Sequence, residues 1–424
     1  MTNYRLKTFA TGDIFEDTGW TLSDPSYNKP SLIRAIYEKK ELCVGEDSLG
    51  IYKFSDWLPI NKTLKNSTVT KTYKSIELAN HLGLSNLYIS FSGYWPKIGA
   101  NMTTCSFKET EAYSVCARLS EQDSGIMVVA SAGNTARAFA KVCSDNNIPL
   151  LLVIPFDYLD AMWFNHSIND NVKLICTPSG TDYFDAIDLS NKICKSPLFF
   201  EEGGAKNVAR RDGMGTTVLS AATTIGRIPD YYFQAVGSGT GTIAAWEANL
   251  RLIEDGHYGS NKMKLIPSQN IPFTPIHDSW KAQTREIVFP NENEARENAL
   301  KIDAKVLSNR RPPYGVAGGL YDALMDSNGD VEIVSNSELH NAAALFEKLE
   351  GIDIHPASGV ALAGMIKSIE SGKVNKESTI MLNITGGGEK LFKSQFKLHY
   401  LKPNLILHNK ENSDHIIKIA KSLF

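Results

Sequence analysis

Short apolar runs, turns and amphipathic segments alternate along the middle of the chain. Residues 126–130 form an unbroken apolar run, 131–135 are small or polar, and 136–143 have the spacing of a helix. A strand, a turn and a helix in this order predict a βα unit of a parallel sheet. Further strands are predicted at 150–154, 172–176, 231–236 and 379–384, and further helices at 109–119, 183–193, 243–254 and 359–369. We therefore expect an α/β protein with parallel-rich sheets flanked by helices.

The length of 424 residues exceeds what one hydrophobic core usually supports, so two lobes are expected. Glycine and proline interrupt the pattern at 226–230, which is where we place the boundary between them. The predicted parts are an N-terminal region at 1–65, an N-terminal α/β lobe at 66–228 and a C-terminal α/β lobe at 229–424. The stretch 267–290 contains four prolines and is predicted to be a long loop or an interface excursion.

Composition narrows the class of protein. The net charge of -3 provides no global positive field for a nucleic-acid backbone, so nucleic acid is not an expected partner. The most apolar stretch, 149–156, is far shorter than the ~20 residues that a bilayer requires. Residues 1–20 contain no unbroken apolar stretch of the kind a secretory signal needs, so export is not expected. The six cysteines include no Cys-x-x-Cys pair, so no metal is expected and the thiols are expected to be reduced. A cytoplasmic location is predicted.

A glycine-rich loop follows the predicted strand 231–236. Glycines alternate with hydroxyl residues in Gly237-Ser238-Gly239-Thr240-Gly241-Thr242. Glycine lets backbone N–H groups approach an anion, hydroxyls donate further bonds, and the helix that follows presents its positive end. The loop is therefore a candidate phosphate cradle, although it lacks the lysine of a Walker loop. A glycine-rich active-site turn without phosphate is the alternative.

Two other segments carry candidate chemistry. The junction 131–135 exposes backbone donors that suit a carboxylate, but its residues equally suit a helix N-cap. Lys108 ends the polar segment 103–108, and a lone lysine is usually a solvated surface charge. A lysine amine in a partly desolvated site can instead form a Schiff base with an aldehyde. A phosphate cradle together with such a lysine points to pyridoxal phosphate as cofactor.

Several motifs of the chain resemble those of a known enzyme family. Five motifs occur in the order seen in threonine synthase and its relatives, and they are Ser106-Phe107-Lys108, the Asn134 loop, 237–241, Glu350 with Pro356-Ala357-Ser358, and Thr385-Gly386-Gly387-Gly388. These are fold type II pyridoxal-phosphate enzymes, two-lobed and similar to the tryptophan synthase β subunit. Longer blocks resemble cysteate synthases, notably 91–96, 104–109, 131–139, 202–205, 207–215 and 233–241.

The resemblance implies roles for residues of this chain. Lys108 would hold pyridoxal phosphate beside Phe107, Asn134 would bond its ring hydroxyl, and Thr385 would face the pyridine nitrogen. A neutral hydroxyl at Thr385 would favour replacement at the β-carbon. The residues expected to hold the cofactor phosphate are Gly237, Ser238, Gly239, Thr240 and Gly241. The residues expected to bind substrate are Thr104, Ser131, Ala132, Gly133, Thr135, Asn207, Arg210 and Arg211.

The implied reaction converts O-phospho-L-serine and sulfite to L-cysteate and phosphate. Both the leaving phosphate and the incoming sulfite are dianions, for which Lys206, Arg210 and Arg211 are candidate partners because arginine's planar fork matches an oxyanion. The alternatives are threonine synthase or cysteine synthase activity on the same fold, and a non-catalytic sensor of phosphorylated amino acids. Relatives commonly self-associate, so a homo-oligomer, with a dimer favoured, is expected.

Overall fold

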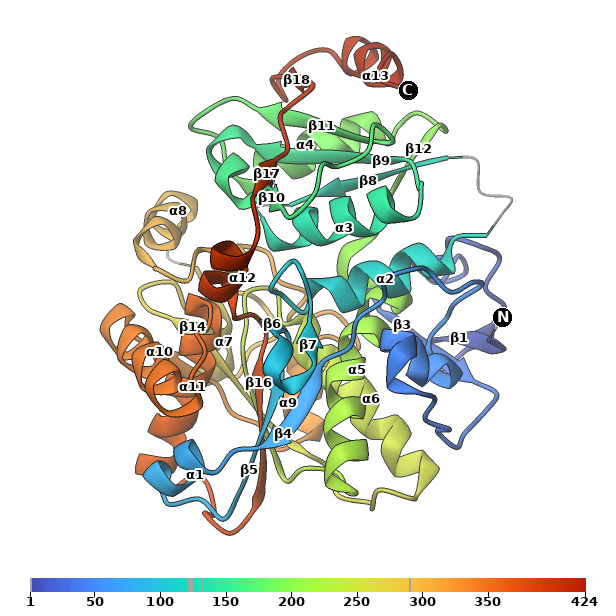
Figure 1. Ribbon diagram of the computed structural model, residues 1–424. Helices are drawn as coiled ribbons and strands as arrows, with labels where there is room; N and C mark the ends of the chain where they lie inside the picture. Colours follow the sequence, from blue (N-terminus) through green and yellow to red (C-terminus); the bar gives the residue numbers. More distant parts are fainter. Residues whose placement is uncertain (1, 121–124, 132, 290) are drawn as a thin grey trace.

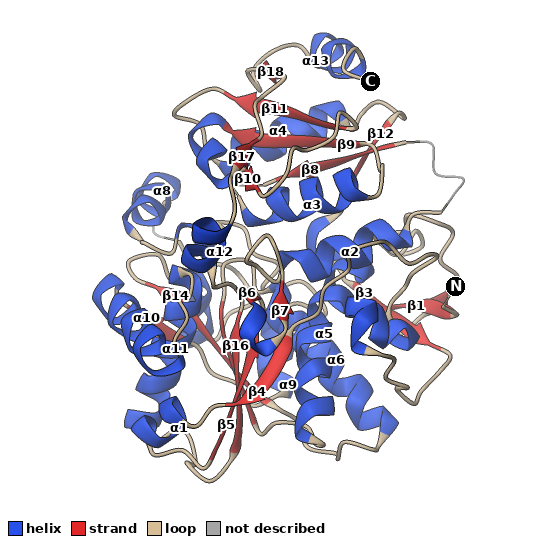
Figure 2. Ribbon diagram, viewed as in Figure 1, coloured by secondary structure: helices blue, strands red, loops and turns tan. Residues whose placement is uncertain are grey.

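The computed structural model describes residues 2–120, 125–131, 133–289 and 291–424. Two α/β lobes stand one above the other in Figure 1, with an N-terminal sheet beside the larger, lower lobe. Figure 2 shows that the strands of each lobe form a central layer and that helices cover both faces. This layering is that of a doubly covered parallel sheet.

The larger lobe is built on a six-stranded sheet in the order β15-β14-β13-β16-β5-β4. Its strands are β15 (Glu332–Val334), β14 (Lys264–Asn270), β13 (Tyr231–Ala235), β16 (Thr379–Ile384), β5 (Asn86–Phe91) and β4 (Lys71–Lys74). All neighbours are parallel except β4, which runs antiparallel to β5 at the edge. The central strands are buried on both faces, which explains their continuous apolar sequences.

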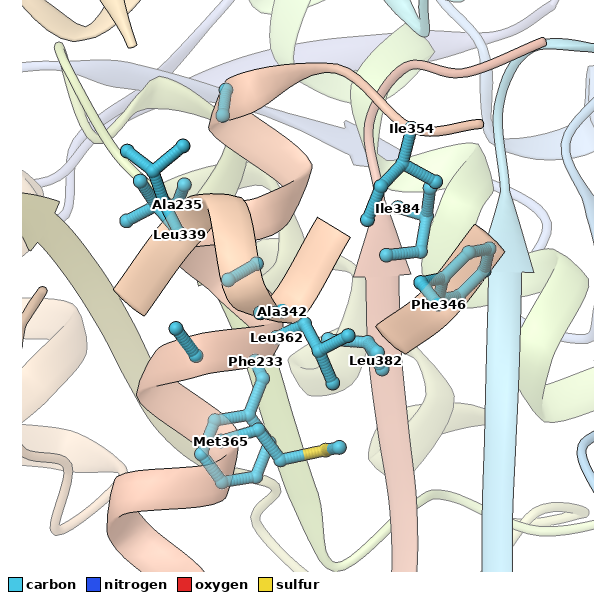
Figure 3. Close-up of a cluster of buried hydrophobic side chains, with 14 of the residues drawn as sticks. Phe233, Ala235, Leu339, Ala342, Phe346, Ile354, Leu362, Met365, Leu382 and Ile384 are labelled. Carbon is cyan, nitrogen blue, oxygen red and sulfur yellow. The ribbon is translucent and has the colours of Figure 1, made fainter. Parts of the chain in front are cut away.

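Helices cover the two faces of this sheet with two separate cores. The helices on one face are α1 (Glu77–Leu82), α10 (Asn336–Glu350) and α11 (Pro356–Glu370), and those on the other are α5 (Val208–Ile225), α6 (Thr240–Asp255) and α9 (Leu320–Asp326). Figure 3 shows the first core, where Phe233 and Leu382 of the sheet lie against Leu362 and Met365 of α11. Alternate residues such as Tyr232 pack into the second core, as the period of two of a strand requires.

The smaller lobe is an all-parallel five-stranded sheet in the order β12-β8-β9-β11-β18. Its strands are β12 (Phe199–Glu201), β8 (Ile126–Ala130), β9 (Leu150–Pro155), β11 (Val172–Thr177) and β18 (Leu405–Ile406). The helices are α2 (Lys108–Arg118) and α3 (Asn134–Asp145) on one face, and α4 (Tyr183–Ile193) and α13 (Ser413–Lys421) on the other. Helix α2 also packs against α5 of the larger lobe, so it lies between the lobes.

The remaining elements are short. The N-terminal sheet is antiparallel, with β1 (Tyr4–Thr8) between β2 (Ile14–Phe15) and β3 (Ile33–Tyr37), and it packs on α5 and α6. Other elements include the strand pairs β6 (Tyr94–Trp95) with β7 (Ala100–Asn101) and β10 (Trp163–Phe164) with β17 (His399–Tyr400). They also include the helices α7 (Pro275–Lys281), α8 (Glu292–Lys301) and α12 (Glu389–Gln395). No helix in the described ranges is long and apolar enough to cross a membrane.

The structure confirms the predicted strands and helices. The two sheets, however, assign segments of the chain to the lobes differently from the predicted lobe boundaries. Strands β4 and β5 fall within the predicted N-terminal lobe, yet they pair with β16 in the larger lobe's sheet. Strand β18 falls within the predicted C-terminal lobe, yet it pairs with β11. The smaller lobe is therefore built from two segments, one between β5 and β13 and the other at β18 and α13, and the larger lobe from the segments around them.

The prediction of a long loop at 267–290 was wrong where β14 and α7 lie, and the alternative of an interface excursion stays a prediction. Pro267 lies inside β14, opposite Gln234 of β13, and α7 follows at Pro275. Proline normally argues against a central strand because it cannot donate to the ladder. Here β14, which has a neighbour on each side, contains a proline. The proline content of the stretch therefore did not predict its secondary structure.

Candidate active site

The candidate site begins at the carboxyl ends of two neighbouring strands. Strands β13 and β16 are parallel and adjacent, so the loops that follow them lie at the same edge of the sheet. These loops are 236–239, which leads into α6, and 385–388, which leads into α12. Ligands of open α/β sheets bind at this edge.

In the glycine loop after β13, neighbouring residues leave no room for a side chain at Gly237 or Gly239. A Cβ at Gly237 would lie 2.9 Å from Leu307 Cα, and one at Gly239 would lie 2.7 Å from Leu320 Cδ2. Gly239 also has φ +79°, which favours glycine. The Ser238 and Thr240 hydroxyls lie 2.9 Å apart at the start of α6. The loop therefore brings backbone and hydroxyl groups to the positive end of a sixteen-residue helix.

The lysine segment is joined directly to the loop after β16. The Phe107 N–H donates to the Thr385 carbonyl at 2.9 Å, and the Gly387 N–H donates to the Cys105 carbonyl at 3.2 Å. Gly386 leaves no room for a side chain, since a Cβ would lie 2.3 Å from His355 Nδ1. These contacts fix the residues that immediately precede Lys108 against Thr385.

Phe107 also connects the lysine segment to the helix that follows the glycine loop. Its ring packs with Met214 of α5 and with Ala244 in the second turn of α6. Lys108 is the first residue of α2, and its Nζ lies 4.8 Å from the centre of the Phe107 ring. The Lys108 side chain is only 20% exposed, so the lysine faces the protein rather than bulk water.

The Asn134 loop reaches the lysine segment through a buried arginine. Arg137 donates to the Asn134 Oδ1 at 2.9 Å, to the Thr104 carbonyl at 3.0 Å and to the Ala161 carbonyl at 2.7 Å. Its guanidinium stacks on Trp163 at 4.0 Å. Burial lowers the pKa of Arg137, while Glu389 acts in the opposite sense. One side chain thus ties the loop of the smaller lobe to the lysine segment.

A chain of four alternating charges starts at Lys108. Its Nζ lies 2.9 Å from Glu111 Oε2, and Glu111 Oε1 lies 3.0 Å from the Arg210 guanidinium. Arg210 in turn lies 2.6 Å from Glu202 Oε2. Burial lowers the pKa of Lys108, Glu111 raises it and Arg210 lowers it further. Burial likewise raises the pKa of Glu202. A lysine with a depressed pKa is the type that reacts with aldehydes.

The structure brings some of the predicted substrate residues together and leaves others apart. Some of them lie on the loops and helix ends that form the candidate site, namely Thr104, Ser131, Gly133, Thr135 and Arg210. Ala132 lies outside the described residues.

Two predicted substrate residues have their polar groups engaged elsewhere. Arg211 is fully buried and donates to Glu247 at 3.0 Å and to the Ala205 and Ile33 carbonyls. Asn207 is the N-cap of α5, with its amide bonded to Arg118 and to the Glu202 carbonyl. The geometry therefore does not place these two side chains in the site.

Glu111, Glu202 and Arg137 belong to the site and were missed from the sequence. Glu111 lies three residues after Lys108, in the predicted helix 109–119. Arg137 lies three residues after Asn134, in the predicted helix 136–143. Residues three apart share a helix face, so the spacing was a usable signal for both. Glu202 lies in the block 202–205 that resembles cysteate synthases, but the sequence did not indicate its contact with Arg210, which it makes from the loop after β12.

The residues present fit pyridoxal phosphate. A half-buried lysine amine with lowered pKa suits the aldehyde, and the glycine loop on α6 suits the phosphate. The Thr242 hydroxyl, in the first turn of α6, is buried without a hydrogen-bond partner in the described part of the chain. Such an orphaned donor near a helix N-terminus is what a bound anion would satisfy.

This fold and site define a pyridoxal-phosphate enzyme of fold type II. A family model described as "Pyridoxal-phosphate dependent enzyme" matches residues 74–386. Among solved structures, maize serine racemase aligns with a TM-score of 0.57 at 15% identity, covering 77% of this chain and 91% of its own. The serine racemase of Dictyostelium discoideum aligns with a TM-score of 0.52 at 16% identity, covering 76% and 92%. At these identities the likeness concerns the fold.

Relatives in sequence narrow the class. The cysteate synthase of Methanosarcina acetivorans is 48% identical over 90% of this chain and 92% of its own. That of Methanosarcina barkeri is 44% identical over 99% and 100%, and that of Methanocorpusculum labreanum is 45% identical over 92% and 93%. The chain belongs to the cysteate synthase family of pyridoxal-phosphate-dependent enzymes.

Proposed function

We propose that this chain replaces the phosphate of O-phospho-L-serine with sulfite. The bond from the β-carbon to the phosphate oxygen breaks, a bond from the β-carbon to sulfur forms, and L-cysteate and phosphate are released. The observation that carries the proposal is the 44% to 48% identity to cysteate synthases over 90% or more of the chain. The partly buried lysine, whose neighbour Phe107 packs on the helix that follows the glycine loop, supports the same chemistry.

The cofactor would be held by residues from both lobes. Lys108 would hold its aldehyde, the loop Gly237, Ser238, Gly239, Thr240 and Gly241 its phosphate, Asn134 its ring hydroxyl and Thr385 its ring nitrogen. When bound, pyridoxal phosphate draws electrons from the amino acid and makes the α-proton acidic.

The chain's own groups would move the proton and bind the anions. The Lys108 Nζ, once free, is the base that takes the α-proton, and its lowered pKa keeps more of it in the neutral form. The N-terminus of α3 at 131–135 would receive the substrate carboxylate. Arg210 is the candidate cation for phosphate or sulfite through its Nε, which is buried without a partner among the described residues, because its two Nη groups donate to Glu202 and Glu111.

The test is a paired assay on the purified protein with pyridoxal phosphate. O-phospho-L-serine is supplied with sulfite or with sulfide, and O-phospho-L-homoserine is supplied alone, with phosphate and amino-acid products measured by mass spectrometry. Cysteate formed with sulfite, and absent in a Lys108→Ala control, is the expected result. Threonine from phosphohomoserine, or cysteine from sulfide without cysteate from sulfite, would reject the proposal.

Location and assembly are part of the same proposal. We expect a cytoplasmic enzyme, which the six free cysteine thiols support, because disulfides are rare in reducing compartments. We also expect a homodimer in solution, for which size-exclusion chromatography with light scattering is the measurement.

A further inference from the structure

Glu111 contacts the Lys108 amine directly. The two residues lie three apart in the first turn of α2, and the distance from Nζ to Oε2 is 2.9 Å. The Glu111 carboxylate is fully buried, whereas the Lys108 side chain keeps 20% of its surface exposed. A carboxylate in the first turn of a helix is also favoured by the helix dipole. The contact is therefore a fixed part of the fold and not a surface ion pair.

The second oxygen of Glu111 is held from another helix. Arg210 of α5 lies 3.0 Å from Oε1, and Glu202 holds the other side of the same guanidinium at 2.6 Å. Gly213, one turn after Arg210, allows this approach, because a Cβ there would lie 3.1 Å from Glu111 Cα and 2.5 Å from the Thr110 carbonyl oxygen. Each oxygen of Glu111 thus has its own cation, which fixes the carboxylate's orientation toward Lys108.

Three charged groups act on the Lys108 amine. Glu111 belongs to its own helix, Arg210 comes from α5, and Glu202 comes from the loop after β12. Tyr183 at the start of α4 faces Arg210, Glu202 and Glu111, and burial raises its pKa, so it stays neutral. Burial disfavours the ammonium form of Lys108, and Glu111 is the largest influence that favours it. Its removal leaves the lysine beside Arg210.

We propose that Glu111 sets the proton affinity of the Lys108 amine. It opposes the effect of burial and so keeps a larger share of the free lysine as an ammonium, whose proton must leave before the amine reacts with the cofactor's aldehyde. The same carboxylate strengthens the amine as the base that takes the substrate's α-proton, a second consequence that rests on the proposed function. Glu111 is thus a positioning residue that acts through Lys108.

The test measures capture of pyridoxal phosphate by the cofactor-stripped full chain across a pH series, followed by the visible absorbance of the bound cofactor. Glu111→Gln keeps the shape and removes the charge. An opposite charge in contact shifts a pKa by about 1–3 units, so the midpoint of the capture rate should move down by about that much. Capture at neutral pH should then be roughly 10-fold faster or more, since more of the amine is neutral.

Two further variants make the result specific. Glu202→Gln removes the far end of the charge chain and should lower the midpoint by a smaller amount. Glu247→Gln is the matched control, because Glu247 pairs with the neighbouring Arg211 at 3.0 Å in an equally buried setting without touching Lys108. The control midpoint should equal that of the parent protein. A general loss of stability would shift the capture midpoint by the same amount in all three variants.

An unchanged or raised midpoint in Glu111→Gln would overturn the inference. If Glu111→Gln does not fold by circular dichroism, Glu202→Gln decides, and an unchanged midpoint there has the same meaning. With phosphoserine and sulfite, Glu111→Gln should lower kcat and leave KM for phosphoserine unchanged. If the parent protein makes no cysteate while the capture midpoint still shifts, the proposed function fails and the role of Glu111 in cofactor capture stands.

Discussion

Helices α2 and α5 approach closely at Gly213, so a side chain at this position should lower the free energy of unfolding. In Gly213→Ala the new Cβ would lie 2.5 Å from the Thr110 carbonyl oxygen and 2.7 Å from Ser114 Cβ. Ordinary contact begins near 3.4 Å, so the two helices must separate by about 1 Å. Forced overpacking of this kind typically costs about 1–3 kcal/mol. The same movement stretches the contact between Arg210 and Glu111 beyond hydrogen-bond range.

Gly215→Ala is the matched control on the same helix. Its Cβ would lie 3.3 Å from the Ala244 carbonyl oxygen and 3.4 Å from Ala248 Cβ, contacts that small shifts accommodate. Both substitutions gain the same helix propensity, roughly 1 kcal/mol, so the difference between them isolates the packing cost. Urea unfolding should therefore place Gly213→Ala about 1–3 kcal/mol below Gly215→Ala in free energy of unfolding.

The comparison requires that fluorescence and circular dichroism give coincident transitions, because a two-lobed protein can unfold in steps. Equal free energies of unfolding for the two variants would refute the packing argument. They would also remove the structural reason for the short distance between Arg210 and Glu111.

Two further substitutions separate the site from its surroundings. Arg137→Met leaves the Asn134 amide oxygen and the Thr104 and Ala161 carbonyls without their donor, so we expect a loss of about 3 kcal/mol in free energy of unfolding and weaker binding of pyridoxal phosphate in a titration. An unchanged cofactor affinity would contradict this. Arg211→Met strands the buried Glu247 carboxylate and should cost about 3–5 kcal/mol in urea unfolding while cofactor affinity is kept. Loss of cofactor affinity at full stability would instead return Arg211 to the anion site.

The βα units of the chain could be predicted because each follows from the pattern of apolar and polar residues in one short, continuous segment. Strand β8 covers the five residues of the predicted run, and α4 covers Tyr183–Ile193 as predicted. The loops after β8, β13 and β16 follow from the same pattern, since glycine and small polar residues end an apolar run there. The proposed roles of Asn134 and the glycines at 237–241 depend on such loops, so these residues could be singled out as candidates from the sequence.

What could not be predicted depends on partners far away in the chain. Arg210 and Arg211 are neighbours in sequence, yet one reaches Glu111 beside the lysine and the other is enclosed by Glu247 and the N-terminal sheet. On a helix successive residues point about 100° apart, so the choice between them needs the packing of α5. The membership of β5 in the larger sheet likewise depends on hydrogen bonds to β16, nearly three hundred residues later.

The route of the chain through the smaller lobe has a consequence for its synthesis. Strand β18 pairs with β11, and Ile416 and Ala420 of α13 complete the core beneath α4, although they follow β12 by about 200 residues. At about 5–20 residues per second, a ribosome needs roughly 10–40 s to supply them. During that interval the edge of β11 is open to other strands, which is a setting for aggregation or chaperone binding. Nascent chains of this protein should therefore depend on chaperones until residue 420 has emerged.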